Sequence, residues 1–250
     1  MQCATLLINI RNPQRVINMK AIVTGHASGI GLYTVKQFHQ LGYEVYGLDI
    51  KVNNILPNEI KQKRCDLRYE PEVKEVFKSI PNFDVAVNCA GVAGLRKPLA
   101  EFSLSEYQDS FNDVFSPLFN ALTHEINLVK DDMSKRRRII NIASITADFG
   151  AKNMAVYSAA KAAIVNLTKV AAVEHAPHLF VNSISPASID TPMLRNKHNE
   201  KLPDYRQSYL TGDCGQEKDV FSVIEMLLKN DFMTGQNVKL DGGYSSVFKL

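Results

Sequence analysis

The feature that most constrains the fold of this chain is a regular alternation of short apolar segments with longer segments of helical period. The apolar runs predict strands over residues 21–24, 44–49, 84–88, 138–143, 180–184 and 237–240, and a short third strand ends at 64–65, before Asp66. Between them, apolar residues in roughly helical spacing predict helices over 29–41, 71–79, 105–129, 155–174 and 216–228. Strands joined by such helices form βαβ units, so the pattern predicts a doubly wound parallel α/β sheet with helices on both faces.

Length and composition fit one domain of this class. The 250 residues are 45% hydrophobic, and no linker or repeat divides them. A net charge of +3 does not indicate a nucleic-acid partner, and no run of 18 apolar residues indicates a membrane span. The four cysteines lack paired spacing and lack histidines at metal-ligand intervals. This favours a reduced, cytoplasmic protein without a metal site.

The densest basic cluster runs from Lys135 to Arg138, between a helical segment and an apolar strand. Charge runs of this kind are usually exposed, so we expect a solvated loop here rather than a binding surface.

Residues 1–18 precede the first strand and are expected to be an extension of a domain that covers 19–250. They contain Arg11 and Arg15 and no acid, but no long apolar core followed by a small-residue cleavage site. Three interpretations stay open: an artefact of start-codon choice, an extra edge segment, or a weak organelle-targeting peptide.

A glycine-rich turn joins the first predicted strand to the first predicted helix. Its glycines, Gly25, Gly29 and Gly31, allow a sharp turn and let a pyrophosphate approach the backbone N–H groups at the helix N-terminus. The spacing is GxxxGxG rather than GxGxxG, and a plain strand-to-helix turn is the alternative interpretation.

Asp49 favours the nucleotide interpretation. It ends the second predicted strand, 18 residues after Gly31, where a carboxylate can accept hydrogen bonds from an adenosine ribose. The same charge would repel the 2′-phosphate of NADP, and neither His26 nor Ala27 supplies a cation in the turn. The sequence therefore predicts NAD rather than NADP, although Lys51 lies close by and an acid at a strand end is often only a turn former.

Ser144, Tyr157 and Lys161 form a second set. Tyr157 and Lys161 are four residues apart on one predicted helix, so they share a face. An ammonium beside a phenol, and a cationic oxidised nicotinamide, should both lower the pKa of the phenol. Ser144 follows a strand and can hydrogen-bond a substrate oxygen while Tyr157 moves the proton. A Tyr-xxx-Lys pair alone would be an ordinary surface pair.

Taken together and in order, these motifs resemble the short-chain dehydrogenase/reductase family over residues 20–246. The resemblance implies a single-domain Rossmann-type sheet of about seven strands and hydride transfer between NAD and a secondary alcohol or ketone, with Tyr157 as general acid/base. The matching elements are Thr24-Gly-xxx-Gly-Ile-Gly31, Asp49, Asp66-Leu67, Asn88-Cys-Ala-Gly91, Ser144, Tyr157-xxx-Lys161, Asn182-Ser-Ile-Ser-Pro186, Thr191-Pro-Met193 and Asp241-Gly-Gly243.

The resemblance also implies roles for residues whose side-chain chemistry does not by itself indicate a function. Lys161 would hold the nicotinamide ribose as well as tune Tyr157, and Asp66 and Leu67 would lie against the adenine. The cofactor-binding residues expected in this way are Gly25, Ser28, Gly29, Ile30, Gly31, Asp49, Asp66, Leu67, Asn88, Ala90, Gly91, Tyr157, Lys161, Pro186, Ile189 and Thr191.

Two positions depart from the family pattern. The long third helix normally carries an asparagine that completes a proton relay, and Val114 stands at that position. Asn112 lies two residues away, about 200° around a helix, so it cannot simply substitute. Ala187 stands where glycine usually follows Pro186, and it adds a methyl group near the nicotinamide.

The substrate pocket is expected between residues 93–96, 145–154 and a lid over about 193–215. Arg96, Lys152 and Arg195 could favour an acidic or phosphate-bearing substrate, although loop charges are usually solvated. The long helices 105–129 and 155–174 are apolar on more than one stripe, so we expect a homodimer or homotetramer.

Two other functions stay open. Val114 and Ala187 motivate a cofactor-binding scaffold or redox-sensing module with weak or no catalysis. An epimerase or dehydratase of the extended branch would share Tyr157-xxx-Lys161, but only 89 residues follow Lys161, which leaves little room for the larger substrate domain of such chains.

Overall fold

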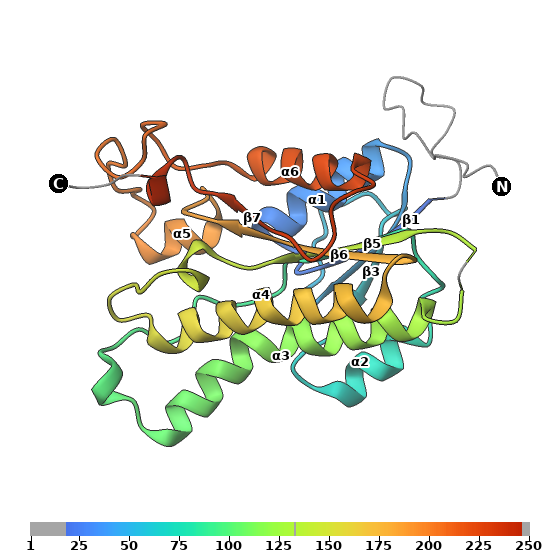
Figure 1. Cartoon of the computed structure of the whole chain (residues 1–250), viewed down its shortest axis with the longest axis horizontal. Coiled ribbons are helices and arrows are strands. Elements are labelled where there is room, and N and C mark those ends of the chain that lie inside the picture. The colour runs from blue at the N-terminus through green and yellow to red at the C-terminus, as the bar shows by residue number, and fades with distance from the viewer. Residues whose placement is uncertain (1–18, 133, 247–250) are drawn as a thin grey trace.

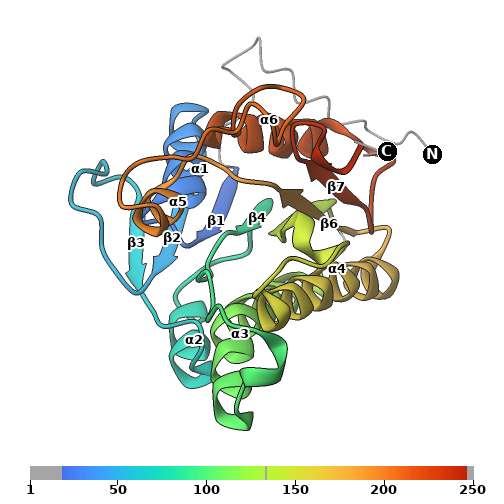
Figure 2. The same cartoon turned by 90° about the vertical axis from the view of Figure 1, so that its left-hand side faces the viewer.

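The computed structural model describes residues 19–132 and 134–246, which form a single seven-stranded sheet between two layers of helices (Figures 1 and 2). All neighbouring strands are parallel, in the order β3-β2-β1-β4-β5-β6-β7, which confirms the predicted fold class. The strands are β1 (Lys20–Thr24), β2 (Glu44–Asp49), β3 (Lys61–Arg64), β4 (Val85–Asn88), β5 (Arg137–Ile142), β6 (Leu179–Pro186) and β7 (Asn237–Leu240). The α-helices are α1 (Gly29–Gln40), α2 (Glu70–Phe77), α3 (Leu104–Val129), α4 (Ala155–His175), α5 (Pro192–Lys197) and α6 (Glu217–Lys229).

Side chains of the central strands alternate between two hydrophobic cores. In β1, Ile22 belongs to the core under α2, α3 and α4, whereas Ala21 and Val23 belong to the core under α1 and α6. Because a strand points successive side chains to opposite faces, a continuous apolar run is what a strand covered on both faces requires.

The strand order reverses between β1 and β4, and this reversal opens a crevice at the carboxyl ends of the strands. There the turn after β1 meets the loop after β4: a Cβ at Gly25 would lie 2.8 Å from the backbone nitrogen of Ala90. The segments expected to bind the cofactor are therefore brought together by topology.

The third strand is Lys61–Arg64, and it ends where the short strand was expected to end. Its sequence, Lys-Gln-Lys-Arg, has no apolar alternation because β3 is an edge strand with partly exposed side chains. Pairing with β2 defines it, with Tyr46 opposite Lys61 and Asp49 opposite Arg64.

Helix α4 is the one helix in the described part of the chain that is long and apolar enough to cross a membrane, judged by length and composition. Of its apolar window, 44% is buried inside the structure, and the helix packs against α3 and β6.

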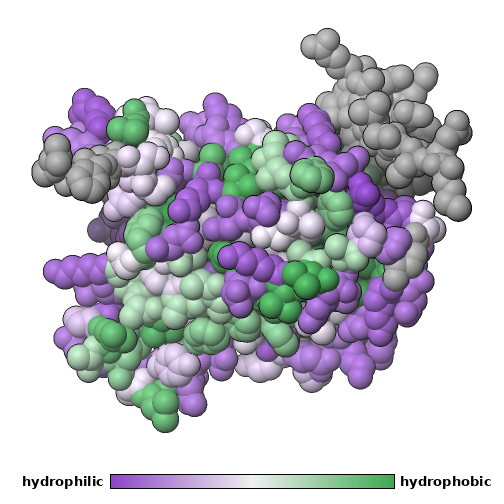
Figure 3. All heavy atoms as spheres, viewed as in Figure 1, coloured by the Kyte–Doolittle hydropathy of each residue, from purple (hydrophilic) through white to green (hydrophobic). Residues whose placement is uncertain are grey.

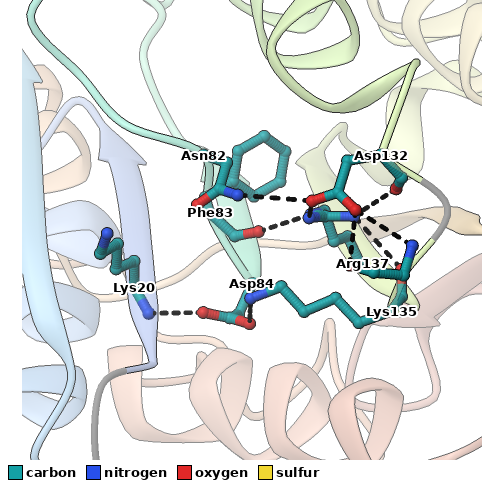
Figure 4. Close-up of polar contacts among 8 residues, drawn as sticks. Lys20, Asn82, Phe83, Asp84, Asp132, Lys135 and Arg137 are labelled. Carbon is teal, nitrogen blue, oxygen red and sulfur yellow. Dashed lines mark hydrogen bonds and ion pairs between the residues drawn. The ribbon is translucent and has the colours of Figure 1, made fainter.

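The expectation that residues 135–138 form a solvated loop holds for Lys135 and Arg136, which are exposed, and is wrong for Arg137 and Arg138, which belong to β5. Arg137 begins β5 and is 1% exposed, and Figure 4 shows its guanidinium directed between Phe83 and Asp132. Its Nε donates to the Phe83 carbonyl at 3.0 Å, its Nη1 donates to the Asp132 carbonyl at 2.7 Å, and Nη2 pairs with the Asp132 carboxylate. The arginine satisfies backbone carbonyls where the chain enters β4 and β5, which a count of charges along the sequence does not reveal.

We expect Arg137→Met to destabilise the protein by about 3 kcal/mol, because it leaves buried carbonyls and a carboxylate without their donor. Arg136→Met is the matched control, because Arg136 makes a partly exposed ion pair with Asp231, and such pairs contribute about 1 kcal/mol or less. Urea unfolding of both variants measures the difference. Equal losses would contradict a special role for Arg137.

Candidate functional site

A cavity of about 600 Å³ lies in the crevice between β1 and β4, at the N-terminus of α1. Ser28 is the N-cap of α1, but its side chain accepts no capping hydrogen bond, and the first turn contains no acidic residue. The N–H groups of this first turn therefore receive no side-chain cap, which fits the pyrophosphate of a dinucleotide.

Each glycine of the turn is required by backbone geometry. A Cβ at Gly31 would lie 2.1 Å from the carbonyl oxygen of Gly25, a distance that no side chain tolerates. Gly25 has φ +71° and Gly29 has φ +51°, conformations that strain other residues. The unusual GxxxGxG spacing thus gives a tight turn that brings the N-terminus of α1 to the cavity.

The carboxylate of Asp49 lines the cavity and also holds the turn. Its Oδ2 accepts from the backbone nitrogen of Ala27 at 3.0 Å, and its Oδ1 accepts from that of Lys51 at 3.0 Å. His26 points inward instead: it is fully buried, its Nε2 lies 2.8 Å from Gln62 Oε1, and its ring fills the space beside Gly47.

Two basic residues, Lys51 and Arg68, also line this cavity. The sequence alone shows only that Lys51 lies close to Asp49, and it indicates no role for Arg68. Arg68 is engaged by Asp66 at 2.7 Å and Asp113 at 2.8 Å, while Lys51 is exposed. The pairing with Arg68 holds the pKa of Asp66 below its usual range. Nothing in the local sequence indicates that Asp113, on α3, would meet Arg68.

A second cavity, of about 340 Å³, adjoins the first and contains Ser144, Tyr157 and Lys161. Ser144 follows β5, and the other two side chains come from the first two turns of α4. Six residues line both cavities, so the two form one continuous site: Ile30, Cys89, Gly91, Val92, Thr191 and Met193.

The expected lowering of the Tyr157 pKa by Lys161 does not occur in this structure. Burial raises the pKa of Tyr157, with Ser144 and the charge of Arg96 opposing that shift. Lys161 is itself buried, which lowers its pKa to about 8, and its Nζ donates to the Ile142 carbonyl at 3.0 Å. The Nζ also lies over the Tyr157 ring, 5.7 Å from its centroid, while its hydrogen bond goes to the backbone.

Val114, which stands where the family pattern has asparagine, lies close to Gly94, as does Tyr157. It is fully buried, and a Cβ at Gly94 would lie 3.5 Å from its Cγ2 and 3.6 Å from the Cβ of Tyr157. Asn112 lies on the exposed side of α3. Near Tyr157 the structure therefore has a valine methyl group where the family pattern has the asparagine of the proton relay. Asn112 does not replace that asparagine.

Asn88, expected at the cofactor, lies in the core and lines neither cavity. Its Nδ2 donates to Glu125 Oε2 at 2.9 Å and to Asn141 Oδ1 at 3.0 Å, and its Oδ1 accepts from Thr24 Oγ1 at 3.3 Å. Thr24 Oγ1 in turn accepts from the backbone nitrogen of Ala90 at 3.2 Å. Asn88 thus holds the loop that lines the cavity, and its neighbours Cys89, Ala90 and Gly91 face the opening.

The other residues expected at the site line one cavity or the other. The cofactor cavity receives Gly25, Ser28, Gly29, Ile30, Gly31, Asp49, Asp66, Leu67, Ala90, Gly91 and Thr191. The second cavity receives Ser144, Tyr157, Lys161, Pro186, Ala187 and Ile189. Among the described residues, no group of three or more His, Cys, Asp or Glu side chains could hold a metal ion.

Sequence reasoning identified the three segments that wall the second cavity but missed Tyr244. Gly242 and Gly243 have positive φ, and Cβ atoms there would lie 2.6 Å from Thr211 Oγ1 and 2.7 Å from Leu210 Cδ1, so this close turn carries the chain back over the pocket. The ring of Tyr244 then lies 5.4 Å from that of Phe149. Lys152 and Arg195, expected as possible pocket cations, do not line it; Arg195 pairs with Asp190 instead.

Comparison with known proteins supports an oxidoreductase. A family model described as enoyl-(acyl carrier protein) reductase matches residues 25–245. The 3-oxoacyl-[acyl-carrier-protein] reductase FabG of Chlamydia pneumoniae is 32% identical, over 91% of this chain and 97% of its own. The 3-hydroxyacyl-CoA dehydrogenase type-2 of Rattus norvegicus is 30% identical, over 91% and 95%. A solved 4-hydroxyisoleucine dehydrogenase complexed with NADH has a TM-score of 0.83 at 26% identity, covering 92% of this chain and 100% of that one.

The buried carboxyl of Glu125 makes stability depend on pH. Burial raises its pKa from the ordinary value of 4.5 to about 7, with the hydrogen bond from Asn88 opposing the shift. Between these values the unfolded chain is ionised at this residue and the folded chain is protonated. Folding then takes up a proton, so the contribution of Glu125 to the free energy of unfolding falls as pH rises from 4.5 to about 7. Above that range its destabilising contribution is constant.

We expect Glu125→Gln to match the wild type near pH 4.5 and to be more stable at pH 8, by up to roughly 3 kcal/mol. Glutamine keeps the acceptor for Asn88 and carries no charge. Urea unfolding of both proteins from pH 4.5 to 8 measures the difference at each pH, which removes contributions that the two share. A difference that does not change with pH would contradict the assignment.

Proposed function

The chain belongs to the short-chain dehydrogenase/reductase family, and on that premise we propose that it is an NAD-dependent oxidoreductase acting on a secondary alcohol or ketone. One observation carries the proposal. Ser144, Tyr157 and Lys161 share a cavity that is continuous with the opening at the uncapped N-terminus of α1.

A bound nicotinamide supplies the hydride for carbonyl reduction and accepts it in alcohol oxidation. The Tyr157 phenol, lining the pocket, gives its proton to the carbonyl oxygen as the alcohol forms, and takes it back in the reverse direction. The Ser144 hydroxyl, which accepts from Thr146 at 3.1 Å, is placed to hold the substrate oxygen. Lys161 would hold the nicotinamide ribose and stabilise the phenolate, since its ammonium is already desolvated beside the ring.

The preference for NAD over NADP rests on Asp49. Its carboxylate lines the cavity at the end of β2, where a ribose 2′-phosphate would meet a negative charge. His26 is turned into the core, and Arg68 is occupied by two carboxylates, so neither offers a free cation to such a phosphate. A cytoplasmic location accompanies this proposal, with Cys65, Cys89 and Cys214 all free thiols.

An apolar surface on α3 and α4 supports self-association as a homodimer or homotetramer. A ladder of rings, Tyr107, Phe111, Phe115 and Phe119, runs along α3 with neighbouring centroids 5.3 to 6.1 Å apart. On α4, Val173 is 84% exposed, and Figure 3 shows apolar side chains gathered over both helices. Exposed apolar surface of this extent favours burial against a second copy.

Sedimentation equilibrium at micromolar concentration should therefore give a dimer or tetramer. We expect Phe119→Glu to shift it toward monomer, because the charge would be buried at the interface. A stable wild-type monomer would contradict self-association through these helices.

A cofactor-binding module with weak catalysis is the second candidate function, and Val114 is the observation that favours it. The methyl group at the relay position interrupts the route by which Tyr157 would exchange its proton with solvent.

Tyr157→Phe separates the two functions. We expect it to abolish NADH-dependent ketone reduction while changing the Kd for NADH by less than about threefold, because phenylalanine lacks the transferable proton but fills the same space. Fluorescence titration of NADH and turnover across a panel of ketones measure both quantities. Tight NADH binding with turnover equal in the two proteins, or absent in both, would favour the binding module.

Asp49→Asn tests the nucleotide preference. The wild type should bind NADH at least about 10-fold more tightly than NADPH, and the variant should lose most of that ratio as the repulsion disappears. Asp148→Asn, an acid that pairs with Lys239 and does not line this cavity, should leave the ratio unchanged. Since loosening of the turn would weaken both nucleotides alike, the ratio is the decisive measurement. A wild-type preference for NADPH would overturn the role of Asp49.

A further inference from the structure

Besides Lys161, two basic side chains line the second cavity without any acidic neighbour there. Arg96 comes from the loop after β4, and Lys197 comes from the end of α5. No aspartate or glutamate is found among the residues that line this cavity. Both cations are exposed, so they lie where the pocket opens to solvent.

Neighbouring basic residues on the same segments are neutralised. Lys97 pairs with Glu106 at 2.8 Å, and Arg195 pairs with Asp190 at 2.6 Å. Within residues 19–132 and 134–246, no carboxylate lies within ion-pair distance of Arg96 or Lys197. The contrast singles out these two as the uncompensated positive charges on the solvent side of the pocket, apart from the buried Lys161.

The charge of Arg96 influences both Tyr157 and Lys197. Partial desolvation, and then the charge of Arg96, lower the pKa of Lys197. The same guanidinium opposes the rise that burial causes in the pKa of Tyr157. Arg96 is therefore close enough to influence the phenol on one side and the ammonium on the other. Two like charges facing one opening repel each other until an anion enters between them.

The remainder of the pocket is aromatic and apolar. The rings of Tyr209 and Tyr244 lie 5.8 Å apart, and Phe149 stacks on Tyr244 at 5.4 Å. A ligand that fills the cavity would contact these rings along its body and the two cations at one end.

We propose that the substrate of this site carries an anionic group, a carboxylate or a phosphate, which Arg96 and Lys197 bind while its ketone or alcohol carbon lies at Tyr157. This inference rests on the proposed oxidoreductase function and adds the substrate class. The anion belongs either to the skeleton of a small oxo acid or to a phosphorylated carrier joined to it. Arg96 and Lys197 are specificity-determining residues in either case.

Matched pairs of ketones that differ in charge test the proposal. The small pairs are 4-oxopentanoate with its methyl ester, and 4-acetylbenzoate with its methyl ester; the carrier pair is acetoacetyl-CoA with acetoacetyl-N-acetylcysteamine. With NADH, we expect the anionic member of at least one pair to have a kcat/KM about 10-fold or more above that of its neutral partner. Preference within the small pairs identifies a carboxylate of the skeleton, and preference within the carrier pair alone identifies carrier phosphate.

Arg96→Gln and Lys197→Gln should each remove most of that advantage by raising the KM of the anionic member. The ratio of anionic to neutral kcat/KM is the decisive measurement, because the charge of Arg96 also reaches Tyr157 and acts on both members alike. Lys152→Gln is the control, because Lys152 is an exposed cation near the lid that does not line the pocket. Neutral members that equal the anionic ones in every pair would overturn the proposal, as would a preference that survives in the double variant.

Binding separates failure of this inference from failure of the proposed function. The Kd of 4-acetylbenzoate and of its ester for the NADH complex can be measured by calorimetry without any turnover. If NADH binds and no ketone is reduced, the oxidoreductase proposal fails; tighter binding of the acid, lost in the double variant, would still support the anion site. Equal Kd values for acid and ester, and for acetoacetyl-CoA and its neutral analogue, would overturn it.

Discussion

The amide of Asn88 is the interaction on which the rest of the site depends. It joins β1 through Thr24, β5 through Asn141 and α3 through Glu125, all inside the hydrophobic core. Asn141 extends the chain of bonds to Thr168 on α4 at 3.0 Å. A buried polar network costs free energy unless its members are paired, so it fixes one relative position of these elements.

That position determines where the cofactor cavity and the pocket meet. Thr24 holds the backbone of Ala90, and Gly25 packs against the same residue, so the loop after β4 cannot move independently of the turn after β1. Helix α4, tied through Thr168, carries Tyr157 and Lys161 from its first turns. One oxygen of the Glu125 carboxyl has no partner, and burial raises the pKa of this carboxyl to about 7.

Charges around the site are arranged by tertiary pairing rather than by local composition. Arg68 and Arg195 are neutralised by carboxylates, and Arg137 donates hydrogen bonds to backbone carbonyls at the opposite end of the sheet. Arg96 and Lys197 stand out only after these pairs are known. The pKa of Tyr157 is likewise raised by burial, and the ammonium of Lys161, which lies over the ring, donates its hydrogen bond to the Ile142 carbonyl.

By itself, the sequence determined the layers of the fold and the positions of the glycine turn, Asp49, Ser144, Tyr157 and Lys161. Strand and helix periodicity, and the steric need for glycine at residues 25, 29 and 31, are local properties that the order of residues records directly. Only the tertiary structure decided that Asn88 lies in the core, that Arg137 is buried, that Tyr244 returns to the pocket and that β3 begins at Lys61. Each of these depends on a partner distant in sequence, such as Glu125, Phe83, Phe149 or Tyr46, because hydrogen bonds, burial and strand pairing are set by the packing of elements against one another.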